Sequence, residues 1–169
     1  ILILLLTIPL NILIIVCILI FEGKPIFFKQ KRAGHNGMPF LIYKYRSMNY
    51  KCGADGKLLP DKMRLTPIGK FLRSTSLDEL PNLINVIQGK MSIVGPRPLP
   101  MKYNNLFSMR QISRQLHKPG ITGLAQVKGR NLLGWEERLE LDAMYIEKIS
   151  FFLDLNILFE TIFITIRKK

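Results

Sequence analysis

The 169-residue sequence is poor in the side chains that build disulfide frameworks and metal clusters. It contains two cysteines and two histidines. Cys17 lies in an apolar segment, Cys52 lies in a polar one, and neither histidine has a partner at ligand spacing. These absences argue against a disulfide-stabilised fold and against a zinc site. Internal repeats and low-complexity linkers are also missing, so the length fits one domain with a modest core.

Acidic residues are scarce as well. Asp and Glu total 12 against 25 Lys and Arg, which gives a formal net charge of +13. This excess predicts an anionic partner, which could be nucleic acid, an acidic membrane surface or a phosphorylated substrate. Hydrophobic residues nevertheless make up 48% of the chain, so they must be concentrated in particular segments.

Charge is absent from residues 1–21, where Thr7 and Asn11 are the only polar side chains. About 20 apolar residues can span a bilayer, so composition favours a membrane span. Pro9 leaves an alternative open, because proline removes a helical hydrogen bond and clashes with the preceding turn. The segment could then enter and leave the membrane on one face. The basic residues that follow it predict a cytoplasmic location for the rest of the chain: Lys24, Lys29, Lys31 and Arg32.

The remaining sequence predicts a mixed α/β domain. Residues 25–30 and 40–48 are expected as strands joined at Asn36-Gly37, a strong hairpin signal. Thr66-Pro67 should begin a helix, with Thr as its cap. The other expected elements are a polar loop at 53–63, a helix from Leu80 to Ile87 that ends at Gly89, a strand at 91–94, and helices at 101–117, 134–149 and 151–166. Polar residues within 151–166 favour a helix in the membrane interface over a span.

Asp78 and Glu79 form the most informative pair. Ser76 and Glu79 have the spacing of a capping box, so the two acids could simply begin a helix. Pro81 conflicts with that interpretation, because it would clash with the carbonyl of Leu77 inside such a helix. We therefore expect an irregular junction here. Two adjacent carboxylates near cations suit divalent-metal binding or nucleophilic carboxylate chemistry.

Two glycine-containing segments could supply an anion site. The turn at 95–98 (Gly-Pro-Arg-Pro) would hold the planar guanidinium of Arg97 in a fixed direction, although a structural turn with a solvated Arg is the simpler alternative. Residues 118–131 contain three glycines that would let the backbone approach a ligand, and Lys128 and Arg130 add charge. A turn-rich connection is the alternative for this segment.

Four further charged residues are candidates for the same site. Lys44 and Arg46 alternate along a predicted strand, so their side chains should lie on one face and could bind the same anion. Asp142 and Asp154 are weaker candidates, because either could be an ordinary surface acid.

Five stretches of the chain resemble, in order, the bacterial sugar transferase family, whose members are monotopic phosphoglycosyl transferases. The stretches cover nearly all of the chain after the apolar segment: 40–48 (FLIYKYRSM), 73–86 (RSTSLDELPNLINV), 91–99 (MSIVGPRPL), 119–130 (PGITGLAQVKGR) and 152–155 (FLDL). The resemblance implies a small, compact, membrane-associated α/β domain at 23–169 with interfacial amphipathic helices. It also implies a re-entrant hydrophobic helix at 1–22, broken at a Ser-Pro pair in the family. The corresponding pair here is Ile8-Pro9, so the hydroxyl is missing and Thr7 or Asn11 would have to replace it.

The resemblance further implies the reaction. Asp78 would attack the phosphate that carries the sugar of a UDP-sugar, UMP would leave, and a covalent aspartyl-phosphosugar would remain. Polyprenol phosphate would then accept the sugar phosphate and form a polyprenyl-diphosphosugar. Magnesium (Mg2+) would bind at Asp78 and Glu79, and Glu79 could position the metal or help to deprotonate the lipid phosphate. The other motif residues would bind substrate: Lys44, Arg73, Arg97, Pro98, Arg130 and Asp154.

The expected location is the cytoplasmic face of a bacterial inner membrane, in contact with its lipids, at the first membrane step of glycoconjugate assembly. Capsule, O-antigen, exopolysaccharide and glycoprotein pathways all remain open. The chain does not begin with Met and lacks the basic cluster that usually precedes the first helix, so it could be the catalytic end of a larger polytopic relative. A non-catalytic alternative is a membrane-tethered nucleic-acid-binding or scaffold module, supported by the aromatic and basic residues at 43–46. Because no binding motif accompanies them, we expect no nucleic-acid partner.

Overall fold

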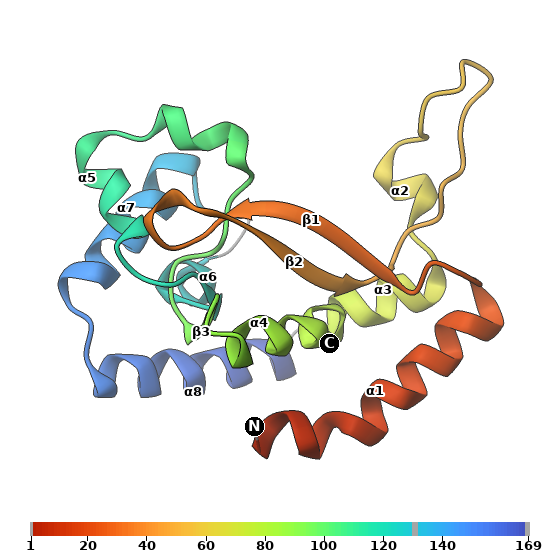
Figure 1. The fold of residues 1–169 in the computed structure, drawn as a ribbon, viewed down its shortest axis with the longest axis horizontal. Coiled ribbons are helices and arrows are strands. Elements are labelled where there is room, and N and C mark those ends of the chain that lie inside the picture. Colours follow the sequence, from red (N-terminus) through yellow and green to blue (C-terminus); the bar gives the residue numbers. More distant parts are fainter. Residues whose placement is uncertain (1, 130–131, 168–169) are drawn as a thin grey trace. The chain divides into compact units, whose positions relative to one another are not determined.

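The computed structural model describes residues 2–129 and 132–167, which form two units. The first unit extends to Lys29 and continues over Tyr43–Leu83, and the second consists of Gln30–Ile42 and Ile84–Arg167. Both helices and strands are present (Figure 1), which confirms the predicted mixed α/β class. Each unit has a hydrophobic cluster of its own.

Helix α1 (Leu2–Phe21) packs on the first unit through one face. Ile14 and Ile18 of this helix are buried against Tyr45 and Leu72. Asn11, on the same face, accepts a hydrogen bond of 2.6 Å from the Tyr45 hydroxyl through Oδ1. From Ile8 to Phe21, most side chains outside this face are apolar and exposed, among them Ile12, Leu13, Val16, Ile20 and Phe21. Among the described residues, no helix combines the length and the apolar character needed to cross a membrane.

Pro9 does not interrupt helix α1, which continues through it as one helix (Figure 1). The break that the sequence predicts at Ile8-Pro9 is therefore absent from the helix. Asn11 Nδ2 donates to the carbonyl of Thr7 at 2.8 Å. Thr7 and Asn11, which were expected to compensate for the proline, are thus one helical turn apart. The side-chain amide of Asn11 makes the hydrogen bond, and Thr7 contributes its backbone carbonyl.

Strands β1 (Phe27–Ala33) and β2 (Pro39–Tyr45) form a two-stranded sheet, which confirms the predicted hairpin with its boundaries shifted by a few residues. The connection η1 (His35–Gly37) has positive φ angles at Asn36 (52°) and Gly37 (71°), as an Asn-Gly turn requires. After the polar loop, a short helix α2 (Asp61–Arg64) precedes α3 (Pro67–Ser74). The Thr66 hydroxyl accepts from the Gly69 amide at 2.9 Å, so the predicted cap of α3 is confirmed.

In the second unit, β3 (Ser92–Val94) pairs in parallel with β4 (Gly120–Thr122). Helices α6 (Leu124–Lys128), α7 (Trp135–Glu147) and α8 (Phe151–Arg167) follow in the chain. Their apolar faces meet β3 in one cluster, whose buried members are Val94, Val127, Tyr145 and Ile157. The sequence predicted β3, α7 and α8, whereas β4 and α6 lie in residues 118–131, where no strand or helix was predicted.

The single helix predicted at 101–117 is wrong. The segment divides into η3 (Met101–Leu106), α5 (Met109–Ile112) and η4 (Ser113–Gln115). Phe107 is extended, with φ −79° and ψ 137°. Ser108 then starts a new helix through a capping box with Gln111. The extended Phe107 and the cap at Ser108 together divide the segment, although the composition of the whole segment suits one helix.

The packing of α1 predicts different effects for two isoleucines two positions apart. Ile18 is fully buried and Ile20 is 70% exposed. Ile18→Ala should lower the free energy of unfolding by about 2–5 kcal/mol, because it removes core contacts and leaves a cavity. Ile20→Ala, the matched control, should change it by less than about 0.5 kcal/mol. Thermal unfolding in one detergent measures both, and equal effects would show that α1 does not pack on the first unit as described.

Candidate active site

The Asp78–Glu79 pair lies on a short 3-10 helix, η2 (Leu77–Asn82), which continues into α4 (Leu83–Ile87). Ser76, just before η2, has a left-handed backbone conformation (φ 60°, ψ 15°), and its side chain makes no capping hydrogen bond. The capping-box interpretation is therefore wrong, and the predicted irregular junction is confirmed. The helix ends before Gly89, whose φ of 70° suits only glycine well.

Lys44 joins the two carboxylates. Its Nζ lies 2.6 Å from Glu79 Oε1 and 3.9 Å from Asp78 Oδ2. Asp78 is only 7% exposed, and the side chains of Lys44 and Glu79 are mostly buried. Such a partly desolvated cluster strengthens electrostatic interactions relative to those of surface ion pairs. Three of the residues predicted for the site thus lie together in the first unit.

A buried amide fixes the position of Lys44 relative to the acids. Asn82, in η2, accepts a hydrogen bond of 2.8 Å from the backbone N–H of Tyr43, and it is 3% exposed. Tyr43 directly precedes Lys44 on β2, and Asn82 lies three residues after Glu79. Strand β2 and the 3-10 helix η2 are therefore hydrogen-bonded to each other next to the ion pair. This bond holds Lys44 in place relative to Asp78 and Glu79.

Two other cations of the first unit that the sequence suggested for the site have different surroundings. Arg73 is exposed at the end of α3, and its Nε donates to the hydroxyl of Ser47 at 2.8 Å. Arg46 does not share an anion site with Lys44, contrary to the expectation from their alternation. It is 6% exposed, and its guanidinium donates to three carbonyls in the turn directly after α1: Glu22, Gly23 and Lys24. A cation at this position stabilises a helix C-terminus.

The remaining predicted residues belong to the second unit or lie outside the described residues. Arg97 is exposed, in the turn that follows β3, and Pro98 is next to it. Asp154, in the first turn of α8, accepts a hydrogen bond of 2.8 Å from the Tyr145 hydroxyl. Burial and this carboxylate raise the pKa of Tyr145. Arg130 lies outside the described residues.

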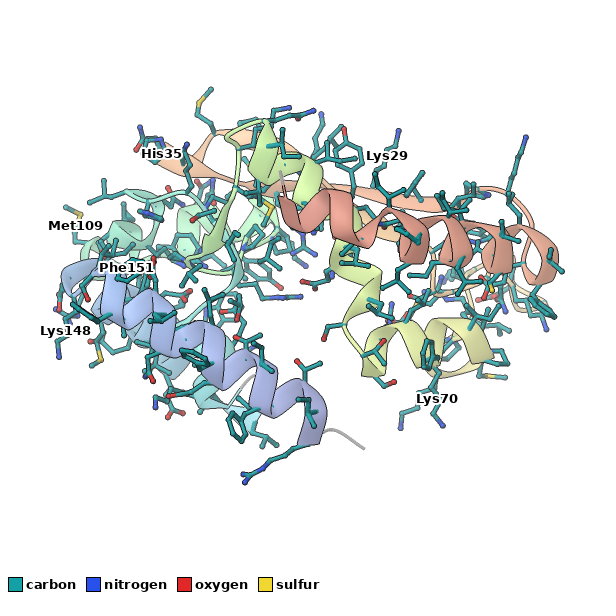
Figure 2. The ribbon with its side chains drawn as sticks, turned by 90° about the horizontal axis from the view of Figure 1, so that it is seen from below. Lys29, His35, Lys70, Met109, Lys148 and Phe151 are labelled. Carbon is teal, nitrogen blue, oxygen red and sulfur yellow. The ribbon has the colours of Figure 1, made fainter. Side chains whose placement is uncertain are left out.

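Asp154 also lines a cavity of about 640 Å3 in the second unit. His117 and Lys118 also line it, and Phe151, which Figure 2 labels at the beginning of α8, is one of several apolar lining residues. The cavity therefore combines a mainly apolar wall with a few charged or titratable groups.

Asp142 is not the surface acid that the sequence suggested. It is 3% exposed, and its Oδ2 accepts hydrogen bonds of 3.0 and 2.8 Å from Nε and Nη2 of Arg114. Burial raises the pKa of Asp142, against the opposing effect of Arg114 and of two further arginines. Sequence reasoning missed Arg114 altogether. The helical spacing of Leu139, Asp142 and Ala143 could have placed Asp142 on the buried face of α7.

The two adjacent acids are the candidate ligands for a metal ion. No group of three or more His, Cys, Asp or Glu side chains suited to a metal exists among residues 2–129 and 132–167. The adjacent carboxylates of Asp78 and Glu79 remain a two-ligand donor set. Mg2+ is commonly bound by one or two carboxylates, with water and substrate phosphates completing its shell, so the pair suits that ion.

Comparison with known proteins gives consistent matches along the chain. A family profile described as bacterial sugar transferase matches residues 1–168. A Bacillus subtilis protein named uncharacterized sugar transferase EpsL is 51% identical over 140 residues. The UDP-glucose:undecaprenyl-phosphate glucose-1-phosphate transferase of Klebsiella pneumoniae is 42% identical over 172 residues, and the exopolysaccharide production protein ExoY of Rhizobium meliloti is 36% identical over 171 residues.

These alignments cover different shares of the proteins. They include 83%, 96% and 91% of this chain for the Bacillus, Klebsiella and Rhizobium proteins, respectively. The corresponding shares of the relatives are 69%, 37% and 76%. The chain thus spans little more than a third of the Klebsiella protein and about three quarters of the Rhizobium protein.

The left-handed conformation of Ser76 generates a stability prediction. A β-branched side chain is strained at positive φ, so Ser76→Val should lower the free energy of unfolding by about 1–3 kcal/mol. Ser76→Gly should change it by less than about 1 kcal/mol, since glycine tolerates this conformation. Ser74→Val, at the exposed end of α3, is the matched control and should cost less than about 1 kcal/mol. Denaturant unfolding measures all three, and equal costs for the two valine variants would contradict the strained turn.

Proposed function

The chain belongs to the bacterial sugar transferase family and is a transferase, and from this premise we propose that it transfers a sugar phosphate from a UDP-sugar to polyprenol phosphate. The Asp78–Glu79–Lys44 cluster is the observation that carries the proposal, because it places a carboxylate pair, which follows the strained backbone at Ser76, against a cation from strand β2. The name of the Klebsiella relative states a reaction of this class.

In the proposed first step, one Asp78 carboxylate oxygen attacks the phosphorus that carries the sugar. The bond from this phosphorus to the bridging oxygen breaks, and UMP leaves with the electron pair. In the second step, a phosphate oxygen of polyprenol phosphate attacks the same phosphorus and releases Asp78. The products are UMP and a polyprenyl-diphosphosugar, and the enzyme returns to its starting state.

Phosphoryl transfer depends on alignment and on neutralisation of phosphate charge more than on proton transfer. Lys44 is well placed for both tasks, since its ammonium group contacts Glu79 and lies 3.9 Å from Asp78. Glu79 holds Lys44 in this position through the 2.6 Å ion pair. Arg73 and Arg97, both exposed, are proposed donor-binding cations, and Arg130 and Asp154 are further proposed substrate-binding residues.

Mg2+ is the proposed cofactor, held by Asp78 and Glu79 together with donor phosphates. When bound, it would supply charge neutralisation at the phosphate oxygens during transfer. The chain's own contribution is the orientation of the carboxylates, which Asn82 and the Ser76 turn fix.

We expect Asp78→Asn to abolish release of UMP from UDP-sugars, because the amide cannot act as the nucleophile. The loss should be at least about a thousandfold. The assay uses detergent-solubilised protein, Mg2+ and a panel of UDP-sugars, with and without undecaprenyl phosphate. Asp61→Asn is the matched control, since Asp61 is a largely exposed acid of the same unit. Full activity of Asp78→Asn, or no release by folded wild-type protein with any UDP-sugar, would contradict the proposal.

The proposed location is the cytoplasmic face of the inner membrane, where polyprenol phosphate is available at the first membrane step of glycoconjugate assembly. Helix α8 supports this location in the second unit. Its side chains fall on two apolar faces separated by a polar strip. One face packs inward through Ile157 and its neighbours. The other is exposed to solvent and consists of Phe151, Phe152, Leu155, Phe159, Ile162, Phe163 and Ile166.

An exposed aromatic face of this kind suits a helix that lies in the membrane interface. Helix α1 presents a second apolar surface, opposite the face that packs on Tyr45 and Leu72. We propose that α1 enters the membrane from the cytoplasmic side, with Ile8 and Pro9 in its deepest part. Ile8 is 43% exposed, as a lipid-facing residue should be.

The proposed orientation of α8 can be tested with spin labels in lipid nanodiscs. In a Cys17→Ser/Cys52→Ser background, Phe159→Cys places a label on the exposed apolar face, and Glu137→Cys places one on the exposed start of α7. The label at 159 should be accessible to oxygen and shielded from a water-soluble nickel chelate, because it enters the acyl region. The label at 137 should show the reverse. Equal exposure of both labels to the nickel chelate would contradict an interfacial α8.

A further inference from the structure

The turn that carries Arg97 is fixed by backbone contacts on its N-terminal side. Gly95 N–H donates to the Thr122 carbonyl, and the Pro96 carbonyl accepts from Gly120 N–H, each at 2.9 Å. A Cβ atom on Gly95 would lie 2.6 Å from the Lys118 carbonyl oxygen. The turn and strand β4 therefore approach too closely for any side chain at this position.

The C-terminal side of the same turn is fixed by a buried side chain. Arg114 Nη2 donates to the carbonyl oxygen of Arg97 at 2.6 Å. Arg114 is 4% exposed; its guanidinium also donates two hydrogen bonds to Asp142 on α7 and lies over the ring of Phe107, 5.4 Å from the ring centroid. Arg97 itself is exposed. Arg97 therefore has an exposed side chain, while its main-chain carbonyl is hydrogen-bonded to the buried Arg114–Asp142 ion pair.

A buried ion pair by itself adds little to the free energy of unfolding. Removing two charges from water costs several kcal/mol per ion, and apolar residues of similar volume are often as stabilising or more so. An apolar pair could not, however, donate a hydrogen bond to the Arg97 carbonyl. The contact to Arg97 is therefore the feature of the Arg114–Asp142 pair that an apolar replacement would lose.

We propose that Arg114 and Asp142 are positioning residues for donor binding, acting through the main chain of Arg97. Asp142 orients the guanidinium of Arg114, and Arg114 holds the carbonyl of Arg97, so that the exposed side chain leaves the turn in one direction. This role rests on the proposed function, in which Arg97 binds the phosphates of a UDP-sugar. The planar fork of Arg rewards such alignment, because it matches phosphate oxygens only in a narrow range of orientations.

The test separates positioning from folding by replacing the whole ion pair. The Arg114→Met/Asp142→Leu double variant removes both charges, so its melting temperature should equal or exceed that of the wild type. Its Kd for UDP, measured by calorimetry in detergent, should rise at least about tenfold, the effect of misdirecting one charge-assisted hydrogen bond. Arg110→Ala breaks the exposed pairs with Glu140 and Glu147 and should leave both quantities unchanged.

A thermodynamic cycle with Arg97→Ala then shows whether the effect passes through Arg97. Arg97→Ala alone should weaken UDP binding by a similar factor. Adding it to the double variant should weaken binding by less than about twofold more, since contacting residues that act as one are not additive. If the double variant unfolds, Arg114→Lys provides the second test, because it keeps the cation but not the planar fork; its Kd should rise at an unchanged melting temperature.

Two results would overturn the positioning role alone. One is wild-type affinity for UDP in a folded double variant or in Arg114→Lys, and the other is full additivity with Arg97→Ala. Absence of UDP binding by the wild-type protein would instead overturn the proposed donor, and the positioning role with it.

Discussion

The ammonium group of Lys44 lies against two carboxylates that are adjacent in the chain. The packing of β2 against η2 in the first unit depends on this contact. Lys44 Nζ lies 2.6 Å from Glu79 and 3.9 Å from Asp78, with all three side chains mostly buried. Two like charges in a partly desolvated site repel each other, so the cation is needed to keep the pair together. Because Lys44 is on β2 and the acids are on η2, the contact also sets how strand and helix pack, and the Asn82 hydrogen bond to Tyr43 reinforces this packing.

Strain and buried polar groups are concentrated around the two proposed ligand-binding segments. Ser76 has a left-handed backbone conformation immediately before the acids, and such conformations persist only when the surrounding contacts impose them. In the second unit, Arg97 follows a turn held by glycine packing and by the buried Arg114–Asp142 pair. Asp78 in the first unit and Arg97 in the second therefore each lie on a segment of backbone that surrounding contacts hold in place. This is the arrangement expected when function requires charges to be in place before the substrate arrives.

Local signals were sufficient to predict much of the fold. The Asn36-Gly37 hairpin, the Thr66 cap of α3, the helix end at Gly89 and the long helices α7 and α8 all depend on residues close together in sequence. The conflict between Pro81 and a regular helix likewise located the irregular junction at the acids. The error at 101–117 arose because overall composition was given more weight than the Ser108 cap.

The missed features depend on contacts between distant residues. Arg114 and Asp142 are 28 positions apart, and Arg46 lies 24 positions from the Glu22 carbonyl that it binds. No local pattern distinguishes a buried, paired Arg from a solvated one, so Arg46 was assigned to the anion site and Arg114 was overlooked. Strand β4 was missed for a related reason, since it has three residues and its backbone hydrogen bonds go to residues 24 or more positions away, in β3 and in the turn that follows β3.

The proposed covalent chemistry of Asp78 is tested most directly by intact mass spectrometry of the wild-type protein incubated with Mg2+ and its UDP-sugar, without a lipid acceptor. The account predicts a mass increase equal to one sugar phosphate, located by peptide mapping on Asp78, and its disappearance when undecaprenyl phosphate is added. An unmodified protein that nevertheless turns over donor in the presence of acceptor, or an adduct on another residue, would contradict it.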